Sequence, residues 1–148
     1  EDALREKCRR WMHDEVARFI QEGGRCRIGE HRAAGEQCVI LSSSSPYATA
    51  PLAEMLGMDA VVCSRLEVEG GRFTGRIVAP LCYGEGKVVW AERYAAERGA
   101  RLEDCAFYTD SYTDLPMLAR VGRPRIVNPD LRLRREARRR GWPIEEWA

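Results

Sequence analysis

The chain lacks the features that mark several large classes of protein. None of its apolar runs approaches the roughly 20 residues that a membrane-spanning helix needs. The charged residues at positions 1–7 have no signal-peptide character. We therefore expect a protein that does not enter membranes and that resides in the cytoplasm.

Metal-binding and disulfide patterns are also missing. The six cysteines include no Cys-x-x-Cys pair, and several stand in apolar stretches such as residues 38–41. This distribution favours buried, reduced thiols over a disulfide framework or a zinc site. His13 and His31 have no partner at ligand spacing, which indicates ordinary structural or surface roles.

Lysine is scarce, because only Lys7 and Lys87 occur among the 24 basic residues. A net charge of +1 argues against a globally basic nucleic-acid binder. The last part of the chain nevertheless carries six clustered arginines: Arg132, Arg134, Arg135, Arg138, Arg139 and Arg140. We expect a solvated helix face paired with glutamates, and a nucleic-acid contact through this helix is the alternative hypothesis.

The pattern of apolar runs predicts an α/β fold. Short apolar runs bounded by turn residues predict buried parallel strands at 37–42, 60–63, 105–109 and 125–127. Helical spacing predicts helices at 2–22, 30–34, 46–56, 87–98, 112–120 and after 129, and two alternating arms around Gly70-Gly71 predict a β-hairpin. Together they indicate a Rossmann-like, three-layer parallel sheet with flanking helices.

A run of serines, Ser42 to Ser45, is placed between a predicted strand and a predicted helix. Free backbone N–H groups and a side-chain oxygen at such a junction can bind an anion. Ser43 is the expected contact because Ser42 more naturally completes the strand. Ser44 is a further candidate for phosphate binding, although Ser44 and Ser45 could cap the helix instead.

Lys87 opens a predicted helix, where its charge is mildly unfavourable beside the positive end of the helix dipole. That placement is expected if the ammonium neutralises a bound anion. The preceding Gly84 and Gly86 do not make a nucleotide P-loop, because that motif needs glycine at Leu81 and serine or threonine at Val88.

Two aspartates, Asp110 and Asp114, follow the predicted strand that ends at Thr109. The turn between them should carry both carboxylates to the same end of the strand. Two carboxylates there can hold a hard divalent cation and orient its neighbours, and magnesium prefers oxygen ligands with several waters retained.

Taken jointly, these segments resemble the haloacid dehalogenase superfamily, in its phosphoserine-phosphatase-like branch. The resemblance runs from about residue 31 to residue 147. It is carried by residues 39–46, 52–57, 71–75, 86–87, 110–118, 127–130 and 141–143.

The resemblance implies a role for each candidate residue. Ser43 would donate a hydrogen bond to the transferred phosphoryl group, and Lys87 would balance its charge. Asp110 would bind Mg²⁺, and Asp114 would hold the lysine or a metal-bound water in place. In the family, a separate aspartate attacks phosphorus and forms an aspartyl-phosphate, while a neighbouring aspartate serves as acid and base.

The chain departs from the family pattern because it contains no Asp-x-Asp-x-Thr segment for that nucleophile. We therefore expect a C-terminal fragment, inactive alone, whose central strand comes from a missing N-terminal segment or another chain. Residues 1–35 would be a helical cap remnant and entry helix, and residues 36–148 the α/β core. An exposed gap in the sheet could also drive homo-oligomer formation.

Two further departures concern the pocket. Ser43-Ser44-Ser45-Pro46 replaces the usual Ser-Gly-Gly-Phe, which argues against phosphoserine itself as substrate, and Thr109 replaces a glycine, which could narrow the pocket mouth. The expected function is a Mg²⁺-dependent phosphatase or phosphotransferase acting on a small phosphorylated metabolite. The alternative is a noncatalytic relative that keeps the phosphate pocket and binds a ligand or a protein.

Overall fold

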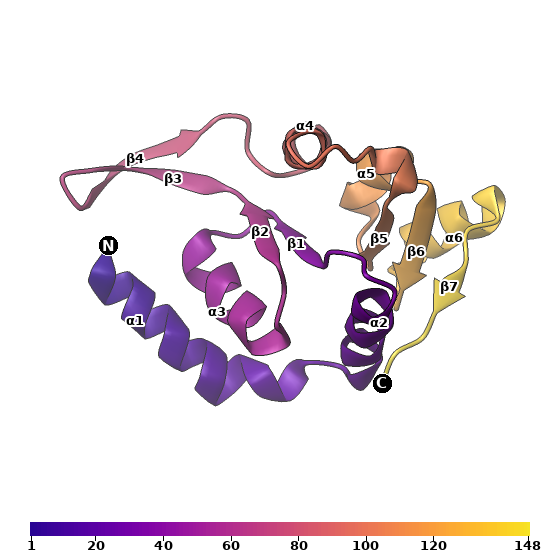
Figure 1. Ribbon diagram of the computed structural model, residues 1–148, viewed down its shortest axis with the longest axis horizontal. Helices are drawn as coiled ribbons and strands as arrows, with labels where there is room; N and C mark the ends of the chain where they lie inside the picture. Colours follow the sequence, from indigo (N-terminus) through magenta and orange to yellow (C-terminus); the bar gives the residue numbers. More distant parts are fainter. The chain divides into compact units, whose positions relative to one another are not determined.

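A computed structural model describes all residues, 1–148, and divides them into two compact units (Figure 1). The first unit is Glu1–Cys82 and the second is Tyr83–Ala148. No helix in either unit combines the length and the apolar character that crossing a membrane requires.

The first unit begins with two helical segments. Helix α1 (Asp2–Trp11) continues through a π-helical turn (Met12–Val16) and a 3₁₀ turn (Ala17–Phe19), and α2 spans Glu22–Ala33. The predicted end of the helix over residues 2–22 was wrong, because the backbone is already extended at Ile20 and Gln21. Gly23 and Gly24 lie in the first turn of α2, where the backbone N–H groups have no intrahelical acceptor in any sequence.

Two parallel strands and their crossover helix follow, as predicted. Strand β1 (Val39–Ser42) pairs with β2 (Ala60–Cys63), and α3 (Pro46–Leu56) connects them. The register is set at the strand entry, where the N–H of Cys38 donates to Asp59 Oδ2 at 2.7 Å and the N–H of Asp59 donates to the Cys38 carbonyl at 2.8 Å. Burial, together with the Asp59 carboxylate, raises the pKa of the Cys38 thiol, so this cysteine is a packing residue.

The predicted hairpin is confirmed as β3 (Arg65–Glu69) and β4 (Arg72–Val78), paired antiparallel. Gly70 and Gly71 form its turn with positive φ angles of 55° and 76°, a conformation that favours glycine. The Phe73 and Tyr47 rings pack edge to face with their centroids 5.5 Å apart, and this contact joins the hairpin to α3.

The second unit contains a three-stranded parallel sheet, β5 (Ala106–Thr109), β6 (Arg123–Val127) and β7 (Ile144–Glu145), in that order. The two-residue strand β7 was not predicted. The helical elements are α4 (Glu85–Ala96), a 3₁₀ turn (Leu102–Asp104), a 3₁₀ turn (Tyr112–Asp114), α5 (Leu115–Leu118) and α6 (Leu131–Arg140). Its core packs Leu118, Ile126, Leu133 and Ala137, each at most 1% exposed.

These elements confirm the predicted α/β fold class, with parallel pairing everywhere except in the hairpin. Within the first unit β1 pairs only with β2, and within the second β5 pairs only with β6. Each of these two strands therefore has one edge without a ladder partner. The assignment of residues 1–35 to a cap remnant stays a prediction.

Asp130 fixes the start of α6 to the loop after β5. Its Oδ1 accepts from the N–H of Leu133 at 2.8 Å, and its Oδ2 accepts from the N–H of Tyr112 at 3.1 Å. Its own N–H donates to the Asp110 carbonyl at 3.2 Å. The N–H donors of Leu133 and Tyr112 stabilise the carboxylate and hold the pKa of Asp130 below its usual value.

We predict that Asp130→Ala lowers the free energy of unfolding by about 0.5 to 2 kcal/mol at pH 7, the usual cost of losing an N-cap. Because the folded pKa lies below the unfolded value of about 3.9, the carboxylate's stabilisation is complete above that pH and declines as the pH falls through the folded pKa. Chemical denaturation at several pH values measures the difference, with Asp104→Ala as the control. A difference that stays constant down to pH 3 would contradict this assignment.

Candidate active site

Lys87 is brought into the interior of the second unit by the first turn of α4. Gly84 precedes the helix with φ of 52°, and the Lys87 N–H donates to its carbonyl at 3.1 Å. The buried face of α4 carries Lys87, Val88, Ala91 and Ala95, so the lysine shares the side that packs inward. The sequence thus buries a charged group in an otherwise apolar helix face.

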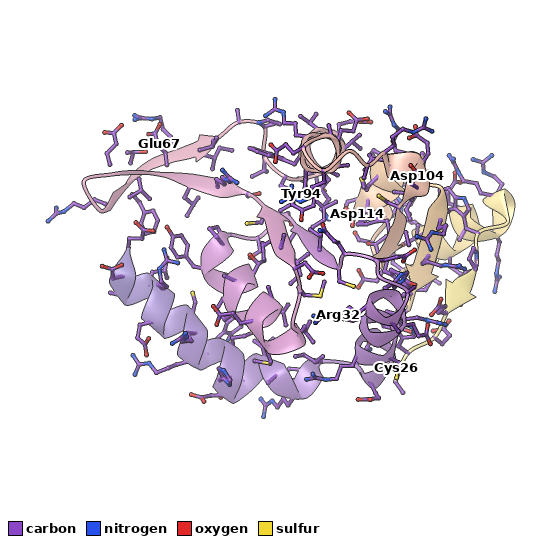
Figure 2. All side chains as sticks on the ribbon, viewed as in Figure 1. Cys26, Arg32, Glu67, Tyr94, Asp104 and Asp114 are labelled. Atoms are coloured by element: carbon purple, nitrogen blue, oxygen red, sulfur yellow. The ribbon has the colours of Figure 1, made fainter.

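Asp114 reaches the same interior from the end of β5. Ser111 caps the 3₁₀ turn, since its Oγ accepts from the N–H of Thr113 at 3.3 Å, and its carbonyl accepts from the N–H of Asp114 at 3.1 Å. This tight turn directs the Asp114 side chain inward (Figure 2), and the residue is only 4% exposed.

Lys87 and Asp114 form a buried ion pair. Lys87 Nζ donates to Asp114 Oδ1 at 2.7 Å, and the two side chains are 10% and 6% exposed. The other carboxylate oxygen, Oδ2, accepts from the Thr109 hydroxyl at 2.8 Å. An ammonium carries more donors than this one acceptor uses, so Lys87 can also donate to a bound anion.

Asp110 differs from Asp114 in its surroundings. It is exposed, it follows the last residue of β5, and no hydrogen bond or ion pair engages its carboxylate. The structure thus brings the two predicted aspartates to one end of β5, as expected, but only Asp114 turns inward. No group of three or more His, Cys, Asp or Glu side chains able to hold a metal occurs in the chain.

Ser43 and Ser44 lie in the first unit, in the exposed bend between β1 and α3. Ser42 completes β1 as predicted, and its Oγ accepts from the N–H of Ser44 at 3.1 Å. Ser45 is the N-cap residue of α3 without a side-chain capping bond. The meeting of Ser43 with Lys87 and Asp110 around one phosphoryl group stays a prediction.

The roles of two residues in the second unit were not predicted from the sequence. Thr109 was treated as a bulky replacement for glycine, whereas its hydroxyl binds the Asp114 carboxylate. Asp130 was read only as part of a segment, although an aspartate just before an arginine-rich helix is a recognisable N-cap signal.

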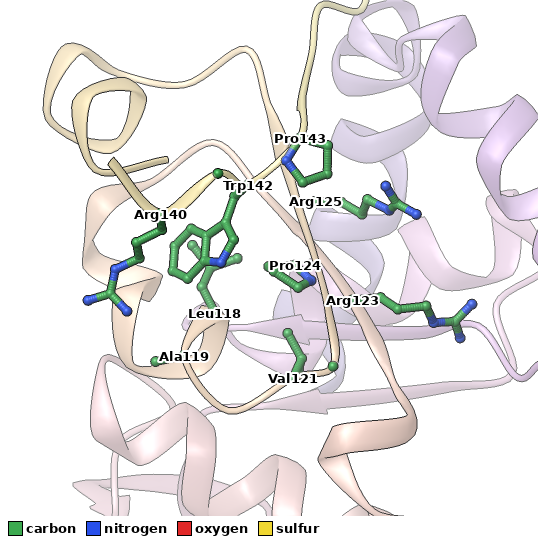
Figure 3. Close-up of a pocket in the computed structure, with 11 residues that line it drawn as sticks. Leu118, Ala119, Val121, Arg123, Pro124, Arg125, Arg140, Trp142 and Pro143 are labelled. Carbon is green, nitrogen blue, oxygen red and sulfur yellow. The ribbon is translucent and has the colours of Figure 1, made fainter. Parts of the chain in front are cut away.

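A hollow of about 520 Å³ lies elsewhere in the second unit and contains none of the predicted site residues. It is lined by the turn between α5 and β6 and by the end of α6, with Trp142 beside Arg140 (Figure 3). The Arg140 side chain points to one side, and those of Arg123 and Arg125 point to the other. The three guanidinium groups therefore do not converge on an anion site.

The second unit thus combines a parallel α/β sheet with a buried lysine–carboxylate pair near the end of β5. The chain belongs to the haloacid dehalogenase-like hydrolase family, whose family model matches residues 1–119, and falls in its phosphoserine-phosphatase-like branch.

Curated relatives with phosphatase names match most of the chain. A probable phosphatase of Mycobacterium tuberculosis is 42% identical over 90% of this chain and 46% of its own length. A histidinol-phosphatase of Neisseria meningitidis is 32% identical over 97% of this chain and 66% of its own. A phosphoserine phosphatase of M. tuberculosis is 36% identical over 92% and 44%, respectively. The chain spans about half the length of most of these relatives.

Solved structures agree on the fold. A protein of unknown function from Bordetella pertussis has a TM-score of 0.88 and 33% identity, over 97% of this chain and 65% of its own. A substrate-bound phosphoserine phosphatase has a TM-score of 0.66 and 24% identity, over 85% of this chain and 58% of its own.

We predict that Lys87→Met lowers the free energy of unfolding by about 3 to 5 kcal/mol, because it leaves the Asp114 carboxylate buried without its cation. The double variant Lys87→Met/Asp114→Leu should recover part of that loss, since it removes both charges. Chemical denaturation measures each value.

The matched control is Lys7→Met, which alters an exposed lysine and should stay within about 0.5 kcal/mol of the natural chain. If Lys7→Met and Lys87→Met lower the free energy of unfolding by equal, small amounts, the buried pair does not stabilise the second unit.

Proposed function

We propose that these residues form part of a Mg²⁺-dependent phosphatase or phosphotransferase acting on a small phosphorylated metabolite. One observation carries the proposal: a buried ammonium, held by Asp114, has donors to spare near the end of the strand that presents Asp110. Membership of a hydrolase family with phosphatase-named relatives supports it.

Each side chain has a defined task in this proposal. Lys87 donates to a phosphoryl oxygen and offsets its charge, while Asp114 keeps the ammonium in position. Ser43 donates its hydroxyl to another phosphoryl oxygen, and the Ser44 hydroxyl is a further donor at the same bend, since the Ser44 N–H is bound to Ser42 Oγ. Catalysis then depends mainly on position and charge, because the phosphoryl transition state needs little covalent help from these residues.

Asp110 is the residue that would hold Mg²⁺. Its exposed carboxylate is not engaged by any other group, and an oxygen donor of this kind fits a hard cation that retains several waters. When bound, the metal supplies positive charge against the phosphoryl oxygens. The remaining protein ligand would come with the nucleophile, since the chain contains no group of three or more His, Cys, Asp or Glu side chains able to hold a metal.

The nucleophile in this proposal is an aspartate from polypeptide outside these 148 residues, which contain no Asp-x-Asp-x-Thr segment. It would attack phosphorus and displace the substrate's alcohol, which a neighbouring aspartate protonates as it leaves. Water would then hydrolyse the aspartyl-phosphate to inorganic phosphate and restore the carboxylate. The unpaired edges of β1 and β5 could each take a parallel strand carrying it, from a preceding segment or another chain. The 148 residues alone would then be inactive.

We propose a substrate class from the names of two of the relatives. Histidinol phosphate and phosphoserine are both phosphate monoesters of amino alcohols, and we propose this class for the present protein. Ser45-Pro46 stands where the phosphoserine-specific pattern has Gly-Phe, which favours a substrate other than phosphoserine.

The nucleic-acid alternative has less support, because most of the arginines on α6 already have partners. Arg139 and Arg140 both bind Glu136 at 2.6 Å, and these contacts lower the pKa of Glu136 to about 2. Arg134 binds Glu146 at 2.6 Å. Arg132 lies over the Tyr112 ring at 4.4 Å. This arrangement favours a solvated, paired helix face.

The test compares the 148-residue chain with the longest polypeptide encoded in frame with it. Phosphate release is measured from L-histidinol phosphate, O-phosphoserine and p-nitrophenyl phosphate, with Mg²⁺ and with EDTA. We expect Mg²⁺-dependent release by the longer protein, fastest with histidinol phosphate, and none by the 148 residues alone.

Activity of the 148 residues without added polypeptide would refute the external nucleophile. A longer protein that has no Asp-x-Asp-x-Thr segment and releases no phosphate, yet binds phosphate esters, would favour the noncatalytic alternative.

A further inference from the structure

We propose that Thr109 is a positioning residue of this site, whose hydroxyl fixes the Asp114 carboxylate and, through it, the Lys87 ammonium. The inference rests on the proposed function, and it concerns a residue at which the chain departs from the family's usual glycine. It requires only contacts within the second unit.

The Thr109 hydroxyl forms hydrogen bonds with two neighbours. It donates its single proton to Asp114 Oδ2 at 2.8 Å, and its oxygen accepts from the N–H of Ser111 at 3.1 Å. Thr109 is half-buried at the end of β5, where pairing with Ile126 fixes its backbone. A β-branched side chain also has few χ1 rotamers, so the hydroxyl is held in one direction.

This contact determines the orientation of the ion pair. The Asp114 carboxylate binds Lys87 through Oδ1 and Thr109 through Oδ2, so it cannot rotate without breaking one of the two bonds. Without the hydroxyl, Oδ2 would be a buried acceptor with no partner, and a charged group in that state is costly. The carboxylate would then turn or admit water, and the Lys87 ammonium would move with it.

The same hydroxyl also connects the pair with Asp110. By accepting from the N–H of Ser111, it holds the peptide that immediately follows Asp110. One side chain thus links the backbone of the cation-binding residue to the residue that holds the charge-balancing lysine. Glycine at this position could supply neither bond.

Three variants separate positioning from simple packing. Thr109→Val keeps the shape and removes the hydroxyl, and Thr109→Ser restores the hydroxyl without the methyl group. Thr113→Val is the matched control, because the exposed Thr113 hydroxyl contacts Ser111 Oγ and not Asp114. Thermal melting of each variant checks that it is folded.

The first measurement is steady-state phosphatase kinetics in the complete enzyme with saturating Mg²⁺. Thr109→Val should lower kcat by about 10- to 100-fold with little change in KM, the usual size of losing a supporting contact behind a site residue. Thr109→Ser should recover most of the rate, and Thr113→Val should match the natural enzyme.

The second measurement does not depend on activity. With Lys7→Arg in the background, Lys87 is the only lysine of the 148-residue chain, so one ¹⁵N signal reports its ammonium. We expect slow exchange of these protons with water in the parent and in Thr109→Ser, and clearly faster exchange in Thr109→Val.

Three results would overturn the inference or its basis. A Thr109→Val protein with parental kinetics and parental Lys87 exchange would overturn it, and so would a Thr109→Ser protein as impaired as Thr109→Val. A complete natural enzyme without phosphatase activity would instead overturn the proposed function, while the exchange measurement would still decide whether Thr109 positions the pair.

Discussion

The buried ion pair between Lys87 and Asp114 is the interaction on which the rest of the site depends. Burying both charges removes them from water, and their attraction offsets that cost only when the geometry is good and the remaining polar atoms are bound. The pair meets this condition, because the Thr109 hydroxyl occupies the second carboxylate oxygen and no buried side-chain nitrogen or oxygen lacks a partner. The ammonium is thereby held in one place while keeping donors for an anion.

The fold supplies the positions of these groups through ordinary local rules. Positive φ at Gly84 starts α4 so that its first turn carries Lys87 inward, and the Ser111 cap turns the chain after β5 so that Asp114 follows. Asp130 fastens that loop to the start of α6. The Asp114 side of the site is therefore supported by the Ser111 and Asp130 caps after β5, at the kind of strand end where parallel sheets commonly gather their functional groups.

The sequence predicted the elements whose signals are local. The apolar runs of β1, β2 and β5 and the Gly70-Gly71 turn were sufficient, because short-range periodicity and turn chemistry determine them. The first helix boundary was placed wrongly, since glycine does not end a helix that is just beginning. The placement of Asp110 and Asp114 at one end of β5 was predicted, but the Thr109 contact was not, because a hydrogen bond across a turn produces no periodic pattern in the sequence. The meeting of Ser43 with Lys87 and Asp110 around one phosphoryl group stays a prediction.

The central claim is that the Lys87 ammonium works on a phosphoryl group rather than merely balancing Asp114. The most direct measurement is kcat/KM of the complete enzyme carrying Lys87→Met, compared with Lys7→Met at matched folded concentration. Loss of one preorganised charge-stabilising donor predicts a fall of about 100- to 1,000-fold at Lys87, with no change at Lys7. Parental activity in a folded Lys87→Met enzyme would contradict the account.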